Sequence, residues 1–498
     1  MIEFLVFNLG EEKVACFNRV YSCGSQPIDD HSKITIRHAD AGKCAQVTRW
    51  LKWIVQLPIE VSHMIHTVGL MIKNQEMIIP VQKQLVQDRA IHRMASPTGS
   101  QHIVTSTRIA NEILRHYRND EDGLFSFGAK GDNARLFLPV LQDIVEEPVN
   151  LEDFLFTCHS RQAKVCREAI LDFFGPKNLP VLRERLKEIV KSALIHLEKQ
   201  EVDGVIHCSA RELTGTFTVA VVSNLLLGKE AANFADYQPI SQAISVCMEH
   251  AMMKFVWMKP TPQQERAYQD ALKVLRDTIN HSEGDFLNAL KDTGMTDVQR
   301  KGVLFLMYIA GGETSSSLLE YMLWQLGQHP EYQNEIFESI KQAKHEPGSI
   351  MDRVLQESLR LHTPTAFICR TPRTDLEVHV ENSDKSHWKY LLPKGQNVLV
   401  TPYFAGRNPA TCHEPNLFDP HREESVKNAS LPWNVFGRGK HGCPGKWLAL
   451  TEIRALTEAL LERYEVESGP MQVPRQKQLL TITLDPQVSL TLKRRNHL

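Results

Sequence analysis

The segment over residues 431–466 constrains the fold more than any other part of the chain, because a glycine-rich loop leads directly into a helical pattern. After the loop, apolar residues recur at steps of three and four, which predicts an amphipathic helix. Cys443 therefore precedes a helix N-terminus, where unpaired backbone N–H groups and the helix dipole stabilise a thiolate. The loop glycines permit tight turns and leave space for a flat ligand beside the backbone.

Cysteine usage and net charge exclude several classes of protein. The ten cysteines include no C-x-x-C pair, which is typical of a reduced compartment and argues against a disulfide framework or a zinc ribbon. The formal net charge of −2 gives no reason to expect nucleic-acid binding. With 498 residues, of which 42% are hydrophobic, the chain can bury a large core. We expect a cytoplasmic, monomeric protein.

The first 80 residues are interpreted as an N-terminal segment of uncertain role, ahead of a single domain over residues 81–498. The apolar segment at the start of the chain ends at Gly10 and two glutamates, so it is too short to span a bilayer. Residues 47–72 are apolar but interrupted by charged residues, which predicts core-packing helices. The alternative is an interfacial helix, with Trp50 and Trp53 beside basic residues, that gives the protein a peripheral membrane contact.

The rest of the chain predicts a mainly α fold with a small β-subdomain. Residues 90–117 read as strand, turn, strand and helix. Helical periodicity dominates from about residue 150 to 365, and a turn-rich β stretch follows over 370–401. The tail carries two strand-like runs around Asp485 and Pro486.

The loop around Cys443 has a specific pattern, F-x-x-G-x-H-x-C-x-G, formed by Phe436, Gly439, His441, Cys443 and Gly445. This pattern resembles the haem-binding loop of the cytochrome P-450 family. The resemblance implies the P-450 fold, built as a single domain around haem b, with Cys443 as the axial ligand of the iron. It also implies that His441 contacts a haem propionate and that Phe436 and Gly445 lie beside the haem near the sulfur. The alternative for this residue is an inert, buried free cysteine.

An acid and an alcohol follow two glycines inside a long predicted helix. Gly311 and Gly312 each cost about 0.5–1 kcal/mol relative to alanine there, so they suggest a kink or a close approach. Glu313 and Thr314 come next, and taken alone they make an ordinary polar patch. The segment also resembles the family's oxygen-activating A-G-x-[DE]-T motif. That resemblance implies that Thr314 positions oxygen and water while Glu313 delivers protons.

A charged pair and a later arginine complete the resemblance. Glu357 and Arg360 stand three residues apart on one predicted helix, so they can pair. They match the family's E-x-x-R motif, and FDPHR supplies Arg422 as the third member of a structural triad. Arg370 and Arg167 match positions that contact haem propionates in the family. Arg167 lacks the tryptophan or histidine partner that many members have, and a solvated arginine is the alternative for Arg370.

The resemblance, which covers roughly residues 90–495, implies a haem-thiolate monooxygenase that hydroxylates or epoxidises a lipophilic substrate. The substrate classes are a fatty acid, a sterol or a terpenoid. Oxygen and two electrons complete the reaction, and a separate ferredoxin or flavin reductase supplies the electrons. This donor is expected to dock near Arg438, Lys440 and Lys446, for which the alternative is a solvated basic turn. Two alternative functions are a haem-thiolate isomerase or dehydratase of peroxides, and a non-catalytic haem or gas sensor.

Overall fold

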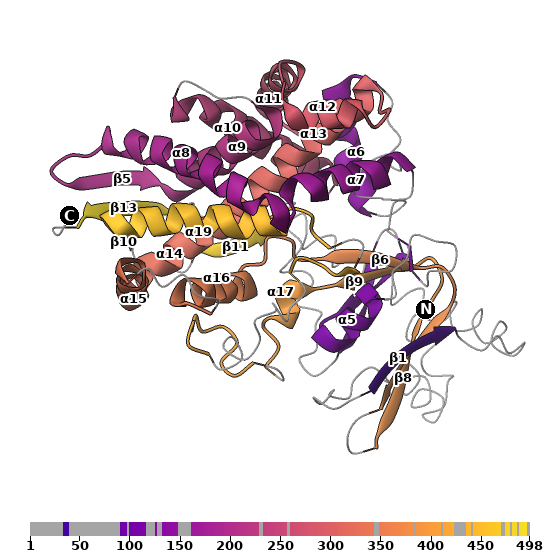
Figure 1. Ribbon diagram of the computed structural model, residues 1–498. Helices are drawn as coiled ribbons and strands as arrows, with labels where there is room; N and C mark the ends of the chain where they lie inside the picture. Colours follow the sequence, from indigo (N-terminus) through magenta and orange to yellow (C-terminus); the bar gives the residue numbers. More distant parts are fainter. Residues whose placement is uncertain are drawn as a thin grey trace, which may run out of the picture. The chain divides into compact units, whose positions relative to one another are not determined.

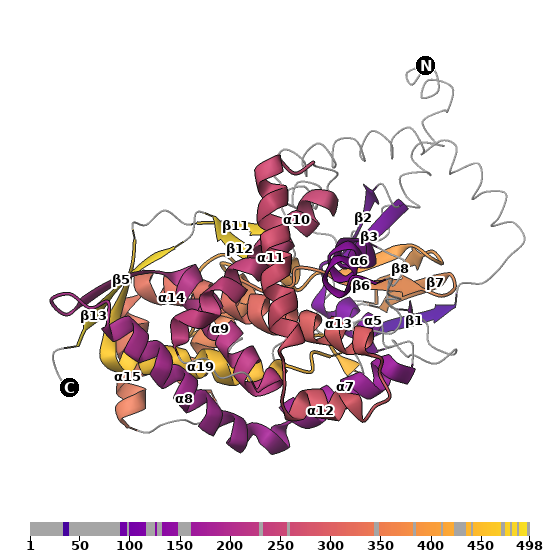
Figure 2. The ribbon, with the colours of Figure 1, turned by 90° about the horizontal axis from the view of Figure 1, so that it is seen from above.

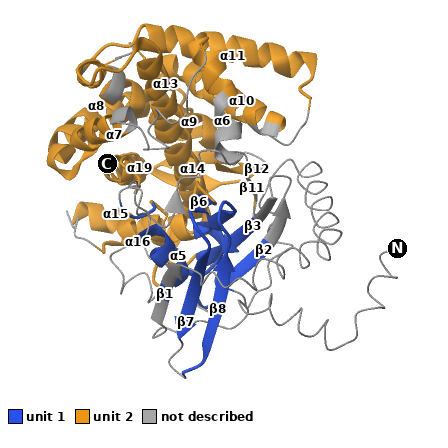
Figure 3. Cartoon of the chain, turned by 90° about the vertical axis from the view of Figure 1, so that its right-hand side faces the viewer, with its two compact units in different colours: residues 1–132, 367–415, 437–440 blue, residues 133–366, 416–436, 441–498 orange. Residues whose placement is uncertain are grey.

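The computed structural model describes most of the chain, in two compact units that are coloured separately in Figure 3. One unit comprises residues 1–132, 367–415 and 437–440, and the other comprises residues 133–366, 416–436 and 441–498. Residues 47–72, His441 and Lys440 lie outside the described part of the chain. The described residues are 33–38, 90–96, 99–115, 125–126, 132–147, 161–228, 233–255, 259–342, 348–381, 385–409, 412–422, 435–439, 442–469, 474–478, 481–485 and 488–495.

The first unit is built on two small β-sheets. One sheet has the strand order β2-β3-β9-β6-β4, in which only β3 and β9 are parallel, and the other has the order β1-β7-β8. Apolar side chains of helix α5 and of these strands, among them Ile113, Val378 and Trp388, form its core. The elements are β1 Lys33–His38, β2 Ile91–Ser96, β3 Gly99–Val104, α5 Thr107–Arg115, β4 Phe125–Ser126, β6 Ile368–Pro372, β7 Leu376–Glu381, β8 His387–Leu392, β9 Asn397–Val400 and α17 Pro402–Ala405.

The second unit is mostly helical. Its helices are α6 Asp132–Val145, α7 Arg161–Phe174, α8 Leu179–Glu198, α9 Ala210–Leu227, α10 Gln238–Phe255, α11 Pro262–Asn280, α12 Asp285–Lys291, α13 Asp297–Met307, α14 Thr314–Gln328, α15 Pro330–Lys341, α16 Ile350–Leu361 and α19 Lys446–Arg463. Short 3-10 turns, η2 Pro176–Asn178 and η3 Phe234–Tyr237, lie on either side of α8 and α9. Its strands are β5 Val205–Ser209, β10 Tyr464–Ser468, β11 Arg475–Gln478, β12 Ile482–Asp485 and β13 Ser489–Arg494.

Helix α14 runs through the centre of the second unit. Every side chain from Ser315 to Leu326 is buried. Helix α9 packs along it, and α8 lies alongside α19, as Figures 1 and 2 show. A helix that is buried on all sides has no solvent face for charged residues, so each one found there needs a partner or must be neutral.

The two central glycines coincide with a change in helix type. Residues Tyr308–Glu313 form a π-helical segment, η4, between α13 and α14. A Cβ atom on Gly311 would lie 2.8 Å from a methyl group of Val222 on α9, so the glycine permits the close approach of the two helices. The close approach expected from the sequence is therefore present at Gly311.

Several sequence predictions are confirmed at the level of elements. Strands β2 and β3 and helix α5 form the predicted strand, turn, strand and helix. Helix α19 begins three residues after Cys443. The two tail strands have different partners, since β12 pairs with β11 whereas β13 pairs with β10 and β5. Strand β1, from the first 80 residues, pairs with β7 in register from Lys33 opposite Glu381.

Among the described helices of 18 residues or more, none is apolar enough to cross a membrane.

Candidate functional site

The Cys443 loop is closed by a backbone hydrogen bond. The N–H of Cys443 donates to the carbonyl oxygen of Phe436 at 2.7 Å. Gly437 and Gly439 both adopt φ of 66°, a left-handed conformation that favours glycine. A Cβ on Gly445 would lie 3.9 Å from the sulfur of Cys443, so a larger residue there would occupy the space beside the thiol. The loop therefore keeps the region next to the sulfur free of side-chain bulk on this side.

The thiol of Cys443 lies among groups that act on its pKa in opposite directions. Its side chain is exposed, although enough protein surrounds it for burial to raise the pKa of the thiol. The backbone N–H groups of Gly445 and Lys446, together with the charge of Arg167, act in the opposite direction and favour the thiolate. Thiolate sulfur is a soft donor that suits iron, and a bound cation would complete the deprotonation. The assignment of Cys443 as the ligand of the iron stays a prediction.

Two predicted cofactor residues lie beside this loop. The guanidinium of Arg167, on α7, donates to the carbonyl oxygen of Gly442 next to the cysteine. Phe436 packs against the core of the second unit, and the ammonium of Lys446 lies 5.8 Å from its ring centre. The structure thus brings Arg167, Phe436 and Gly445 together with Cys443, whereas His441 lies outside the described residues.

The acid of the predicted acid–alcohol pair is held by partners from two other helices. Glu313 forms an ion pair with Arg211 of α9, and the Ser245 hydroxyl of α10 donates to its other carboxylate oxygen at 3.0 Å. Only 6% of the Glu313 side chain and 14% of the Arg211 side chain are exposed. Although burial lowers the pKa of Arg211, the charges of Glu313 and other glutamates raise it overall, which keeps the guanidinium charged.

The alcohol of the pair is tied to the π-helical segment. The hydroxyl of Thr314 donates to the carbonyl oxygen of Ala310 at 2.6 Å, four residues earlier. This bond uses the proton of the hydroxyl and leaves its oxygen lone pairs as acceptors. Thr314 can therefore receive a hydrogen bond from a small polar molecule beside the π-helical segment.

The charged triad is assembled as the sequence predicts. Arg360 donates to both carboxylate oxygens of Glu357, at 2.7 Å and 2.6 Å, and Arg422 donates to one of them at 3.3 Å. Both guanidinium groups also donate to the carbonyl oxygen of Leu417 at 2.9 Å. The backbone N–H of Asp419 donates to Glu357 at 3.0 Å. The triad therefore anchors the segment 417–422 to helix α16.

Arg370 belongs to the first unit. It lies on β6, is 1% exposed, and donates to the carbonyl oxygen of Cys369 at 2.8 Å. The alternative of a solvated arginine at a strand start does not fit this burial. Its contact with a haem propionate stays a prediction.

The sequence did not single out three charged residues of the second unit, namely the partly buried Arg211 and the buried Glu320 and Glu452. The two glutamates had a weak signal, because each stands beside apolar helical positions, whereas Arg211 had none. Glu452 is 2% exposed on α19 and receives a hydrogen bond from Ser315, next to Thr314. Burial raises its pKa from 4.5 to about 8. Glu452 is therefore a carboxyl that the fold keeps neutral at neutral pH.

The buried carboxyl of Glu452 predicts a pH dependence of stability. The unfolded chain loses this proton near pH 4.5, whereas the folded protein keeps it up to about pH 8. The wild-type free energy of unfolding should therefore fall as pH rises through this window, by on the order of 4 kcal/mol from this group. The Glu452→Gln variant should lack that decline in urea unfolding measured at pH 5, 6.5 and 8. Parallel curves for the two proteins would contradict the prediction.

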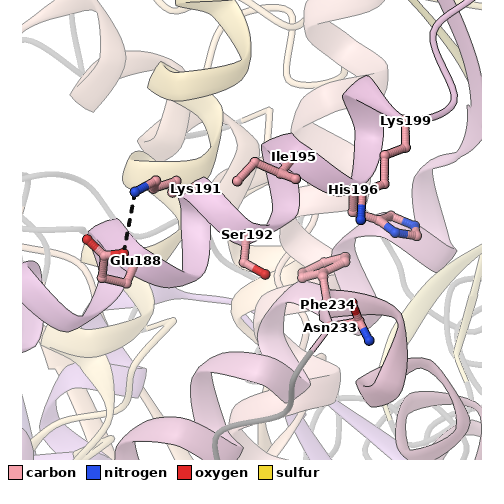
Figure 4. Close-up of a pocket in the computed structure, with 8 residues that line it drawn as sticks. All are labelled: Glu188, Lys191, Ser192, Ile195, His196, Lys199, Asn233 and Phe234. Atoms are coloured by element: carbon pink, nitrogen blue, oxygen red, sulfur yellow. Dashed lines mark ion pairs between the residues drawn. The ribbon is translucent and has the colours of Figure 1, made fainter.

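A surface pocket of about 230 Å³ lies on α8, away from these residues in the sequence (Figure 4). Its lining is mostly polar, and Glu188 and Lys191 form an ion pair in it. It contains none of the residues predicted for the site. The lining residues are Glu188, Lys191, Ser192, Ile195, His196, Lys199, Asn233 and Phe234.

Comparison with known proteins gives a consistent result. A family model described as Cytochrome P-450 matches residues 143–492. A sterol 14alpha-demethylase of Mycolicibacterium vanbaalenii is 29% identical over 220 residues, which make up 41% of this chain and 45% of that protein. A sterol 14-demethylase of Arabidopsis thaliana is 30% identical over 282 residues, covering 50% and 57%. The chain thus spans about half the length of these two relatives.

A longer match and a solved structure extend the comparison. Costunolide synthase of Cichorium intybus is 24% identical over 392 residues, which cover 70% of this chain and 74% of that protein. The crystal structure of a mutant cytochrome P-450 haem domain superposes with a TM-score of 0.64 at 18% identity. The superposition covers 82% of this chain and 90% of that one. The mainly α fold with small β-sheets is therefore the fold of that haem domain.

Proposed function

The chain belongs to the cytochrome P-450 family, and from this premise we propose that it is a haem-thiolate monooxygenase acting on a lipophilic organic substrate. The observation that carries the proposal is the environment of Cys443. Its exposed sulfur faces the free N–H groups of Gly445 and Lys446 at the start of α19. Two relatives are sterol 14-demethylases, which favours a sterol-like lipophile among the substrate classes.

The residues around Cys443 fit haem b, the cofactor of this family. Cys443 would bind the iron, while Phe436 and Gly445 would lie against the macrocycle beside the sulfur. Arg167, Arg370 and His441 would neutralise the propionates. When bound, a thiolate-ligated haem activates O2 with two electrons and two protons, so that one oxygen atom enters the substrate and the other leaves as water.

In the proposed reaction, the side chains of the protein supply protons, which pass from Glu313 toward Thr314. Ser245 and Arg211 hold the Glu313 carboxylate in place, in the turn that precedes α14. The Thr314 oxygen keeps its acceptor capacity, because its own proton is bonded to Ala310. Such a pair can orient a water or oxygen molecule by hydrogen bonding and pass a proton to it. An acid–alcohol pair of this kind favours monooxygenation over the rearrangement of a peroxide.

A separate electron donor is part of the proposal. Arg438 is exposed, Lys446 is partly exposed, and both lie within five residues of Cys443 in the sequence. An acidic ferredoxin or flavin reductase is the kind of partner that such basic residues attract. Cytoplasmic location and a monomeric state stay predictions.

The proposed function is tested with the purified holoenzyme. We expect the reduced protein with carbon monoxide to show the red-shifted Soret band of thiolate-ligated haem. We also expect sterols or terpenoids from a lipophile library to shift the resting spectrum and to be oxygenated only when electrons are supplied. Turnover of a peroxide without an electron donor would favour the isomerase instead. Binding of haem with no turnover of any library member would favour the sensor.

Replacing Thr314 by alanine should separate oxygen reduction from product formation. Haem binding and oxygen consumption should persist, while product per electron falls by about 100-fold, the lower range for losing an acid–base group. Electrons should then appear as hydrogen peroxide. Thr278→Ala is a matched control, because its hydroxyl also donates to the carbonyl four residues earlier, at 2.8 Å on α11. Equal product per electron in wild type and Thr314→Ala would remove Thr314 from the mechanism.

A further inference from the structure

A second buried carboxyl lies on the same helix as the proposed proton donor. Glu320 of α14 is 1% exposed, seven residues after Glu313. Glu313, Ser316 and Glu320 follow one another at steps of three and four, so their side chains lie along one face of the helix. Neither carboxyl oxygen of Glu320 has a hydrogen-bond partner of normal geometry among the described residues. A charge there would be poorly compensated, which favours the neutral acid.

One guanidinium faces this row of side chains. Arg211 of α9 pairs with Glu313 and donates to the hydroxyl of Ser316 at 3.2 Å. Ser316 also shares a hydrogen bond of 3.0 Å with the hydroxyl of Thr214. The charge of Glu320 acts on Arg211 as well, second only to that of Glu313. The charges of two carboxyls, Glu313 and Glu320, therefore act on the same guanidinium.

The charged groups around this cluster come from three helices. Glu313 and Glu320 belong to the α14 row, Arg211 comes from α9, and Glu249, exposed on α10, also acts on Arg211. For Glu320 itself, burial is the largest influence and raises the pKa to about 7. Arg211 and the backbone N–H of Val488 lower it, whereas the charge of Glu313 raises it. A carboxyl with a pKa near the ambient pH exchanges its proton at little free-energy cost.

We propose that Glu320 stores a proton for Glu313 and that Arg211 follows the negative charge between them. The O–H bond of the Glu320 carboxyl breaks and an O–H bond forms on the Glu313 carboxylate, so the negative charge moves from Glu313 to Glu320. Arg211 then pairs with the Glu320 carboxylate. One guanidinium, one carboxylate and one carboxylic acid are present before and after the step, so charge and protons balance.

The proposal deepens the function proposed above, since a Glu313 freed from Arg211 is an acid that can serve Thr314. The ion pair seen in the structure is the state in which Glu313 has no proton to give. Uptake of a proton from Glu320 removes the charge that binds Arg211 to Glu313. The exchange itself depends only on residues of α9 and α14 and requires no turnover.

The experiment is an infrared titration of protonated carboxyl groups in the resting holoenzyme. The wild type should show a buried carboxylic acid band that disappears with a midpoint near pH 7, and Glu320→Gln should remove this band. Glu313→Gln should lower the midpoint by about 1 unit, because a negative charge has been removed. Arg211→Gln should raise it by about 1 unit, because a positive charge has been removed.

The other buried carboxyl, that of Glu452, provides the control for this titration. Glu452→Gln should remove a different band, with a midpoint near pH 8, and leave the Glu320 midpoint unchanged. A band that survives Glu320→Gln would overturn the proposal, and so would a midpoint that stays fixed in Glu313→Gln. If Arg211→Gln fails to fold, the Glu313→Gln titration still tests the proposal.

Turnover provides a second readout that separates this proposal from the function on which it rests. With an electron donor and substrate, Glu320→Gln should reduce product per electron by up to about 100-fold. It should also flatten the pH dependence of that ratio between pH 6 and 8, which a purely structural role would not do. If the chain oxygenates no substrate, the proposed function fails, while the infrared midpoints still confirm or overturn the sharing of Arg211.

Discussion

The Cys443→Ala variant is expected to lose the red-shifted Soret band of the reduced, carbon-monoxide-bound protein, together with all electron-dependent oxygenation. Alanine removes the sulfur proposed as the iron ligand, while the N–H groups of Gly445 and Lys446 stay in place. A histidine or water ligand that replaced the sulfur would donate less charge to the iron and would favour cleavage of the O–O bond less strongly. This is the largest effect that a single substitution should have on activity.

A second cysteine provides the control for this prediction. Cys208 on β5 is a partly buried free thiol whose pKa is raised to about 11 by burial and by the charge of Glu212, without the N–H groups and the arginine that favour the thiolate at Cys443. Cys208→Ala should leave the spectrum and the turnover unchanged. A wild-type spectrum of the histidine type, or a red-shifted band that persists in Cys443→Ala, would show that the assignment of the ligand is wrong.

The sequence predicted those parts of the site that are local in the chain. The glycine-rich loop and the apolar spacing after it placed Cys443 before helix α19, and the E-x-x-R spacing placed Glu357 against Arg360. Both relationships lie within a few residues, where helix geometry alone determines which side chains meet. The strand, turn, strand and helix at the start of the first unit were predictable for the same reason.

The partners of Glu313 were not predictable in this way. Arg211 lies 102 residues before Glu313, and periodicity shows which face of a helix is buried but not what it is buried against. Ser209 caps α9 by accepting from the N–H of Glu212, so Arg211 looked like an ordinary first-turn residue at a helix end. Its burial follows from the packing of α9 on α14, which only the tertiary structure shows.

The burial of Glu452 and Glu320 was not predicted from the sequence, for a related reason. Glu452 adjoins Ile453, on the face of α19 that the apolar spacing assigned to the core, and Glu320 stands in a segment that reads as a buried helix. A glutamate at such a position is a conflict between pattern and residue type. Such conflicts are expected at functional or strained sites, and here both acids adjoin the acid–alcohol segment of α14 or its hydrogen-bond partners.

The Glu357→Gln variant should lose about 3–5 kcal/mol of unfolding free energy, the usual effect of breaking a buried ion pair by removing one partner. The Glu357 and Arg360 side chains are fully buried and that of Arg422 is 6% exposed, so solvent cannot replace the missing charge. Two guanidinium groups would then share the carbonyl of Leu417 and a neutral amide. Because these groups anchor the segment 417–422, haem retention should weaken along with global stability.

Urea unfolding of the holoenzyme measures this effect, and an exposed ion pair supplies its control. Glu184 and Lys187 on α8 also stand three residues apart, with their charged atoms at 2.7 Å, but both side chains are largely exposed. Water solvates either partner when the other is removed, so Glu184→Gln should change the unfolding free energy by less than about 1 kcal/mol. Similar losses in the two variants would mean that burial does not make the triad structural, and the role assigned to Glu357, Arg360 and Arg422 would be wrong.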